Sequence, residues 1–336
     1  MQRECEISFG GAPVSHGYVI FVPRATIGHD VWDDYVLKHQ DGWLWHTHSW
    51  IAYCLAYKGG ADHSFAVATQ DGKLVGIVPL IVEGTQFSMG GNPTVQMLLT
   101  QGLQPCVEHI IKRIEVVAHL AGVRISESMC WLTRPAEAEL ATIPADLLSP
   151  INQREVTFGR RMVTLTEPKE QRWACVRKSY KQFIRQGQAK YDINKRTPEE
   201  SYQVFLAMHD EFYGHCRPRK TYEIQQELCQ KGFGRAYLAT NDDGFNEGGI
   251  LWYVYKGIAF YASGVYPQDN VSQYLIWASM CELATEGIQY ADLGYQGRAK
   301  NEKEKNIEFT KRGFGGIDWP VPCVETIFTN NEEGVA

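Results

Sequence analysis

Hydrophobic residues in the first half of the chain recur at two spacings. Over residues 30–57, aromatic and aliphatic side chains lie three and four positions apart, which predicts helix. Two later apolar runs flank Asp71-Gly72, a pair typical of tight hairpin turns. The predicted order is helix (30–57), hairpin (63–83), strand (95–100), helix (107–121) and strand (123–132).

The second half repeats this order. Its predicted elements are helices at 170–190, 198–213 and 222–232, a hairpin and long strand at 234–267, a helix at 272–287 and a strand at 288–295. Prolines punctuate residues 136–168, and we expect that stretch to carry the chain between domains. A unit repeated after about 150 residues predicts duplicated domains instead of a short-period solenoid.

Composition narrows the class of protein. The chain has 336 residues, which favours two domains, and its net charge of −6 argues against a general nucleic-acid coat. None of the nine cysteines forms a C-x-x-C pair, so we expect reduced thiols in a cytoplasmic protein. We expect no metal site and no signal peptide. We also expect no membrane-spanning helix, since no stretch approaches about 20 apolar residues.

Positive charge is concentrated on the predicted helix 170–190. Arg177, Lys181 and Arg185 are four residues apart and share one face, with Lys178 beside them. The simplest interpretation is a solvated basic face on a packed helix. The alternative is a surface that binds phosphate or RNA.

The last polar stretch, residues 292–316, follows the end of a predicted strand, where ligands bind in open sheets. Asp292 at that strand end is a candidate base or a capping residue. Lys311 lies in EFTKRGFGG (308–316). The first interpretation of this segment is a glycine-rich turn, and the second is a site at which Lys311 faces the oxyanion of acyl transfer. In the second interpretation the glycines would let the backbone approach a donor.

Residues 234–294 resemble the core of the Gcn5-related N-acetyltransferase (GNAT) fold, although the loop before the last helix, QDNVSQYL (268–275), has no glycine with which to cradle a pyrophosphate. The second half also resembles the Fem family of peptidyltransferases and related proteins of surface-glycan gene clusters. The matching segments are RKSYKQFIRQGQAKYD (177–192), FYGHCRPRKTYE (212–223), FYASGVYP (260–267), GIQYADLGY (287–295) and EFTKRGFGG. In the first half, WHTHSWIAYC (45–54) and DGKLVGIVPLI (71–81) fit as well.

This resemblance implies an α+β fold of two tandem GNAT-like domains, each a mixed, mostly antiparallel sheet flanked by helices. The first would span residues 1–155 with about 317–336 returning to it, and the second 156–316. The implied catalytic residues are Lys311 and Phe309, separated by Thr310, to which we add Asp292. The expected substrate-binding residues are Arg217, Arg219, Tyr222, Tyr261, Tyr266, Tyr295 and Trp50, and the expected donor or RNA contacts are Arg177, Lys178, Lys181 and Arg185. The family's diphosphate-binding lysine has no counterpart directly after Trp50, since Lys58 comes only two turns later.

The resulting hypothesis is an N-acyltransferase without a bound cofactor. Its donor would be aminoacyl-tRNA or an acyl thioester, and its acceptor an amine of a peptide, sugar or small metabolite, with no DNA partner. One alternative is an acyl-coenzyme A-dependent acetyltransferase that acts on a glycan amino sugar. The other is a binding module whose duplicated fold has lost its chemistry. The sequence leaves the oligomeric state open.

Overall fold

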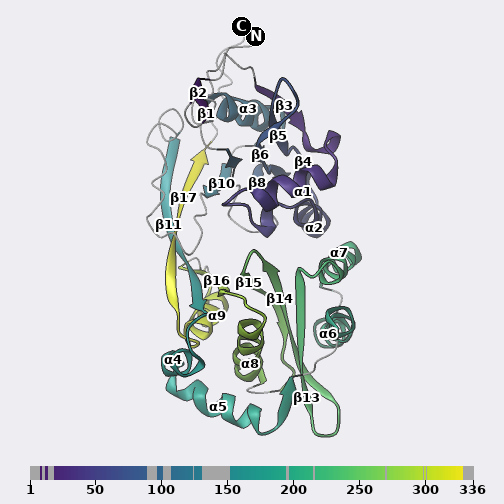
Figure 1. Cartoon of the computed structure of the whole chain (residues 1–336), viewed down its shortest axis with the longest axis vertical. Coiled ribbons are helices and arrows are strands. Elements are labelled where there is room, and N and C mark those ends of the chain that lie inside the picture. The colour runs from purple at the N-terminus through teal and green to yellow at the C-terminus, as the bar shows by residue number, and fades with distance from the viewer. Residues whose placement is uncertain are drawn as a thin grey trace. The chain divides into compact units, whose positions relative to one another are not determined.

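The computed structural model describes residues 19–88, 97–100, 107–123, 125–130, 152–193, 197–214, 216–268, 271–297 and 301–327, together with Ser8–Phe9, Ala12–Pro13 and Ala299. The chain divides into two compact units. Unit 1 contains residues 1–157 and 321–336, and unit 2 contains residues 158–320 (Figure 1). Residues 131–151, which include the first part of the proline-punctuated stretch, lie outside the described residues.

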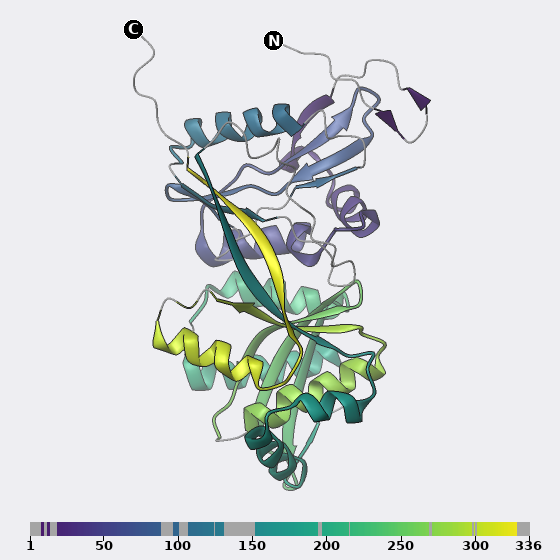
Figure 2. The same cartoon turned by 90° about the vertical axis from the view of Figure 1, so that its left-hand side faces the viewer.

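Unit 1 contains an antiparallel sheet in the order β3-β5-β6-β9. Further strands follow the order β17-β10-β8-β7-β4, and β1 pairs with β2. Both faces of β5 and β6 are buried, and Figure 2 shows α2 and α3 on opposite sides of the strands. The element bounds are β1 Ser8–Phe9, β2 Ala12–Pro13, β3 Val19–Pro23, α1 His29–Lys38, α2 His48–Lys58, β4 Ala61–Asp62, β5 Phe65–Thr69, β6 Leu74–Val78, β7 Ile81–Glu83, β8 Gln86–Ser88, β9 Leu98–Leu99, α3 Val107–Leu120 and β10 Ile125–Cys130.

Unit 2 is a sheet in the order β12-β13-β14-β15-β16-β11. Every neighbouring pair is antiparallel except β15 and β16, which are parallel and pair only over Ile258–Phe260. Helices α5 and α8 cover one face, and α6 and α7 cover the other (Figure 1). The bounds are β11 Asn152–Thr164, α4 Lys169–Cys175, α5 Lys178–Gln188, β12 Tyr191–Ile193, α6 Pro198–Tyr213, α7 Arg219–Gln230, β13 Gly234–Asn241, β14 Asn246–Tyr255, β15 Ile258–Val265, α8 Val271–Thr285, β16 Tyr290–Gln296, α9 Glu302–Arg312 and β17 Ile317–Ile327.

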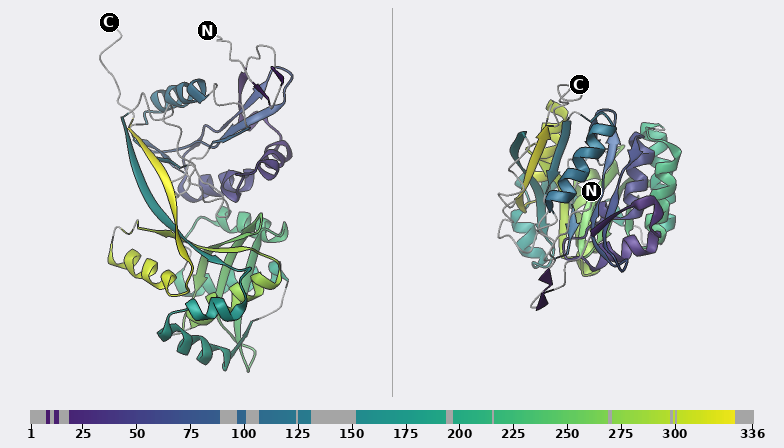
Figure 3. Two further views of the ribbon diagram at one scale, coloured as in Figure 1. Left: turned by 60° about the vertical axis from the view of Figure 1, so that its left-hand side comes forward. Right: turned by 90° about the horizontal axis from the view of Figure 1, so that it is seen from above.

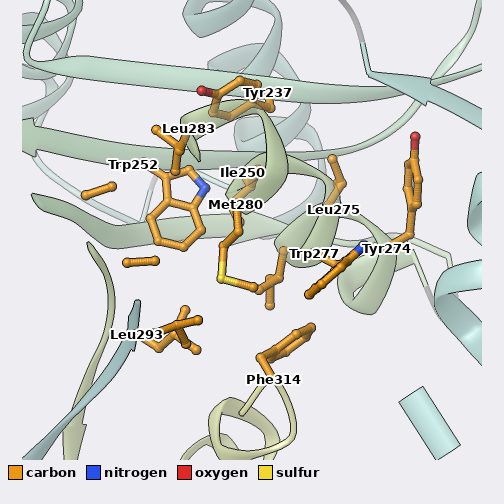
Figure 4. Close-up of a cluster of buried hydrophobic side chains, with 14 of the residues drawn as sticks. Tyr237, Ile250, Trp252, Tyr274, Leu275, Trp277, Met280, Leu283, Leu293 and Phe314 are labelled. Atoms are coloured by element: carbon orange, nitrogen blue, oxygen red, sulfur yellow. The ribbon is translucent and has the colours of Figure 1, made fainter. Parts of the chain in front are cut away.

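The core of unit 2 lies between α8 and the sheet. Trp252 on β14 is fully buried, and its indole N–H donates to Ser279 on α8 at 3.0 Å. Leu293 of β16 and Phe314 belong to the same cluster (Figure 4). These contacts fix α8, β16 and the segment after α9 relative to one another, because close-packed side chains leave few alternative arrangements.

Several predicted elements are subdivided in the structure. The helix expected at 30–57 is α1 and α2, and the one expected at 170–190 is α4 and α5, which are separated at Val176 and Arg177. The long strand expected within 234–267 turns at Lys256-Gly257, where both residues have positive φ, and becomes the hairpin of β14 and β15.

Two elements contradict the sequence interpretation. Residues 152–164, which the prolines assign to a connection, form the strand β11, which pairs with β16. Residues 302–312, which read as a polar loop, form α9, with Asn301 as N-cap and Glu302 and Glu304 in its first turn. The chain passes between the units along β11 and β17, which lie side by side (Figures 2 and 3).

The predicted α+β class is confirmed. The sheets are mixed and mostly antiparallel, and helices cover them within each unit. The strand β17 begins in unit 2, and its residues from Ile327 to Cys323 pair with β10 of unit 1.

Candidate active site

Lys311 lies in the last turn of α9 and extends its ammonium toward β16. A Cβ atom at position 294 would lie only 2.8 Å from Lys311 Nζ, so the lysine occupies space that a side chain would take. Gly294 has φ +92°, in the left-handed region that favours glycine. Burial lowers the pKa of Lys311 from 10.5 to about 8, and Glu308 opposes this shift.

The other glycines of EFTKRGFGG allow neighbouring protein segments to pack closely against the backbone. A side chain at Gly313 would clash with the Tyr180 ring, one at Gly315 would lie 2.7 Å from Cys175 Cβ, and one at Gly316 would clash with the Met162 carbonyl. Protein atoms therefore fill the space that the sequence interpretation assigns to a donor.

Phe309 and Lys311 lie two residues apart on α9, which places them on different faces of the helix. Phe309 is 61% exposed, and the Arg177 guanidinium stacks 3.8 Å from its ring centroid. Arg177 Nη2 also donates to the Phe309 carbonyl at 3.1 Å. The structure therefore separates Phe309 from Lys311 and gives Arg177 a role in holding α9.

Asp292 is completely buried on β16. Its carboxylate accepts a hydrogen bond from Arg160 on β11, with which it forms an ion pair, and another from the Gly294 N–H at 2.8 Å. The same carboxylate thus holds the backbone of the glycine beside Lys311. Tyr295 lies next to Arg160, with its ring centroid 5.9 Å from the guanidinium carbon.

Tyr261 of β15 lies beside Lys311, and Tyr266 of the following loop contacts Tyr261. The Tyr261 ring centroid is 5.7 Å from Lys311 Nζ, and the Tyr261 hydroxyl is 3.2 Å from that of Tyr266. Burial raises the pKa of both hydroxyls, and Tyr213 on α6 raises the pKa of each further. Both phenols therefore stay protonated at neutral pH and can donate hydrogen bonds.

Three expected substrate-binding residues, Arg217, Arg219 and Tyr222, line one pocket of about 510 Å³ between α6 and α7. Leu206, Asp210 and Glu223 complete much of its wall. Burial raises the pKa of Tyr222 to about 12, so its hydroxyl remains neutral. The volume is in the range of small-molecule sites.

The remaining candidates lie elsewhere. Lys181 and Arg185 hold their charges 5.7 and 5.5 Å from the Trp173 ring centroid, and Lys178 is exposed. Trp50 belongs to unit 1, where it is buried between Trp45 and Tyr53, with ring centroids 4.1 and 5.0 Å away. Within the described residues there is no group of three side chains suited to hold a metal ion, and no helix that combines the length and apolarity needed to cross a bilayer.

Sequence reasoning missed Arg160 and Gly294 near Lys311, and Asp210 in the pocket between α6 and α7. Arg160 was hidden in a stretch assigned to a connection, and only the pairing of β11 with β16 brings it to Asp292. Asp210 looked like an ordinary charge on an amphipathic helix. Gly294 was visible in the motif DLGY, where a glycine inside a strand signals a bulge or a close approach.

We expect Gly294→Ala to disable the site by displacing Lys311. The new methyl group would stand 2.8 Å from Nζ, and the backbone would be strained as well. Gly297→Ala is the matched control, because Gly297 has φ +83° but a Cβ atom added there would have no neighbour within 4 Å. Labelling with an amine-reactive reagent, read as the rate of Lys311 modification by mass spectrometry, should change at least several-fold in Gly294→Ala only. Equal behaviour of the two variants would contradict the contact.

No protein-family model matches the sequence, and no curated protein is significantly similar to it. Solved structures share its fold. FemX matches at 10% identity with a TM-score of 0.61, covering 88% of this chain and 96% of FemX. The C-terminal domain (DUF2156) of a putative lysylphosphatidylglycerol synthetase from Agrobacterium fabrum matches at 12% identity with a TM-score of 0.56, covering 90% and 92%. A conserved protein of unknown function from Bacteroides thetaiotaomicron matches at 8% identity with a TM-score of 0.56, covering 90% and 98%. The chain therefore has the fold of FemX, as the Fem-like motifs of its sequence predicted.

Proposed function

We propose that the protein is an N-acyltransferase of the Fem-like type that uses Lys311 to stabilise the oxyanion. The observation that carries the proposal is the Lys311 ammonium itself. It is partly buried beside Gly294, its pKa is lowered to about 8, and no hydrogen bond or ion pair engages Nζ among the described residues. Nζ lies 5.7 Å from the Tyr261 ring centroid and is attracted by the charge of Glu308, but a buried ammonium without a hydrogen-bond acceptor is costly unless a ligand supplies one.

The reaction needs little from the protein beyond positioning and charge. A neutral amine of the acceptor attacks the carbonyl carbon of an aminoacyl ester or an acyl thioester, and the carbonyl oxygen becomes an oxyanion. Lys311 donates a hydrogen bond to that oxyanion, and the C–O or C–S bond of the donor then breaks. In this proposal the hydroxyls of Tyr261 and Tyr266 relay to the leaving oxygen or sulfur the proton that the attacking nitrogen loses, so both phenols end the step protonated. No covalent intermediate on the enzyme is required, since the donor is already activated.

Asp292 takes a supporting role in this proposal. Its ion pair with Arg160 and its hydrogen bond from Gly294 occupy both carboxylate oxygens. We assign it the task of fixing Gly294, and through it the space that Lys311 fills.

The names of two structural neighbours agree with acyl transfer from an aminoacyl donor. FemX carries the name of the Fem family, which this sequence resembles, and the lysylphosphatidylglycerol synthetase domain is named for a product that contains a lysyl group. We infer that aminoacyl-tRNA is the donor. Lys178, Lys181 and Arg185 are the proposed RNA contacts, and the charges of the last two lie near the Trp173 ring.

A donor panel tests this function. The purified protein is incubated with a mixture of amines and either a charged tRNA pool or acetyl-coenzyme A, and new amides are detected by mass spectrometry. We expect product only with charged tRNA, abolished by ribonuclease pretreatment. Product with acetyl-coenzyme A alone would favour the acetyltransferase alternative. Consumption of neither donor would contradict acyl transfer and favour a binding module.

A further inference from the structure

Gln296, at the end of β16, is a buried amide whose hydrogen-bonding capacity is unused. Its side chain is only 1% exposed, and neither Nε2 nor Oε1 has a hydrogen-bond partner among the residues that the structure describes. Gln225, another buried glutamine of unit 2, shows the ordinary arrangement. Its Oε1 accepts from the Tyr202 hydroxyl at 3.0 Å, and its Nε2 donates to the Tyr253 hydroxyl at 2.8 Å. Native proteins pair nearly all buried polar groups, so the unpaired amide of Gln296 needs an explanation.

A bulge in β16 determines which way Gln296 faces. The pairing of β16 with β11 shifts between Asp292 and Tyr295, where β16 has one residue more than its partner. Gly294 lies in this bulge and has φ +92°. One extra residue reverses the alternation of side chains along a strand, so Gln296 lies on the opposite face of the sheet from Asp292.

Helix α9 covers that opposite face. Gly159 of β11 pairs with Gln296, and a Cβ atom added to Gly159 would lie 3.5 Å from Gln296 Cβ and 3.2 Å from Asp318 Cβ. Gln296 and Asp318 therefore share one face of the sheet. Asp318 pairs with Arg312, the last residue of α9, at 3.1 Å. Figure 1 shows α9 beside β16.

Lys311 and Gln296 thus come from α9 and β16 to the same region. Lys311 Nζ is held against Gly294, which is two positions before Gln296 in the chain, and two residues of a strand span at most about 7 Å. Both side chains carry polar atoms without a hydrogen-bond partner among the described residues. Unpaired buried polar groups cost stability, and two of them in one region indicate a ligand that pairs with both.

The chemistry of an amide restricts this ligand. Nε2 donates hydrogen bonds and Oε1 accepts them, so the complementary group presents an acceptor and a donor side by side. An aminoacyl group has this pattern, because its α-amino nitrogen is attached to the carbon next to the carbonyl. A plain acyl group has the carbonyl oxygen but only hydrocarbon beside it.

We propose that Gln296 recognises the α-amino group of an aminoacyl donor and so selects aminoacyl over plain acyl groups. Oε1 accepts a hydrogen bond from the α-amino group, and Nε2 donates one to the carbonyl oxygen that Lys311 also contacts. The identification of this ligand as the donor rests on the function proposed above. A plain acyl group is rejected because it leaves Oε1 buried and unpaired, and a site built to bind a polar group discriminates strongly against an analogue that lacks it.

Binding of stable donor analogues tests this selection on the full-length protein. The probes are 3′-amino-3′-deoxyadenosines that carry glycine, alanine or lysine in amide linkage. Their matched compounds carry acetyl, propionyl or 6-aminohexanoyl groups and lack only the α-amino group. We expect calorimetry to give a Kd at least 10-fold lower for the best aminoacyl probe than for its matched compound. Gln296→Met should reduce this ratio to less than about twofold, whereas Gln230→Met, which changes an exposed glutamine of α7, should preserve it.

Thermal unfolding separates a binding role from a structural one. Gln296→Met should leave the midpoint unchanged or raise it, because methionine removes polar atoms that have no partner. Gln225→Met should lower the midpoint, because it leaves the Tyr253 hydroxyl without the amide that donates to it. A similar drop in both variants would show that Gln296 is a structural amide, held for example by a buried water molecule, and would overturn the proposal.

The binding measurements can also overturn it. Equal affinity of the wild-type protein for each aminoacyl probe and its matched compound would do so, as would a preference that survives in Gln296→Met or the failure of all three aminoacyl probes to bind. None of these measurements needs turnover. Selective, Gln296-dependent binding by a protein that transfers no acyl group would therefore contradict the proposed function alone.

Discussion

Replacing Lys311 by methionine is expected to lower the rate of acyl transfer by about 10²–10³-fold, the loss found when a charge-stabilising donor is removed from an acyl-transfer site. The variant should remain folded, because a thioether fills similar volume and removes an ammonium that is costly to bury. Thermal unfolding should show a midpoint that is unchanged or higher. Lys303→Met, an exposed lysine of the same helix, is the control and should keep full activity. Unchanged acyl transfer in Lys311→Met would refute this placement of the catalytic group.

The pH profile provides a second check on the same group. With the pKa of Lys311 near 8, the stabilising ammonium disappears as pH rises through about 8, so activity should fall above that value. Between pH 8 and 10.5 the lysine is protonated in the unfolded chain but largely deprotonated in the folded protein. The contribution of Lys311 to the free energy of unfolding therefore increases as pH rises across that window. The loss of activity is therefore not unfolding. A rate that rises through pH 8 and then levels off would instead indicate that Lys311 acts as a base.

Asp292→Ala is expected to destabilise the protein by about 3–5 kcal/mol, since it leaves the Arg160 guanidinium without its partner in a buried ion pair. Burial already lowers the pKa of Arg160, which shows the cost of charging that site. Urea unfolding measures the loss. The double variant Asp292→Ala, Arg160→Met should lose much less stability than the sum of the two single-variant losses, because no unpaired charge remains in it.

The control for this prediction is Asp318→Ala. Asp318 pairs with Arg161 and Arg312 at 2.9 and 3.1 Å but is partly exposed, so we expect a loss of at most about 1 kcal/mol. If Asp292→Asn unfolds at the same urea concentration as the wild type and yet transfers no acyl group, the supporting role is wrong and the interpretation of Asp292 as a base gains ground.

Local patterns in the sequence were sufficient for four of the helices and for one hairpin. Apolar spacing predicted α3, α6, α7 and α8, and Asp71-Gly72 predicted the hairpin of β5 and β6, since both signals act over a few neighbouring residues. The same reasoning failed for β11, whose sequence NQREVTFGRRMVT carries three arginines. Only its partners explain that strand, because Arg160 is neutralised by Asp292 and Arg161 by Asp318.

By itself, the sequence determined the α+β class, the Fem-like order of motifs and the choice of Lys311 as the residue to test. Tertiary structure alone decided what surrounds that lysine. Gly294, 17 positions earlier in the chain, leaves the space for Nζ, and Asp292 fixes Gly294 only because β11 supplies Arg160. The tertiary structure also showed that Phe309 lies on a different face of α9 from Lys311, and that the glycines after Arg312 pack against other residues of the same unit. The physical reason is that helix and turn propensities depend on adjacent residues, whereas burial, unpaired charge and lowered pKa values depend on groups that folding brings from distant positions.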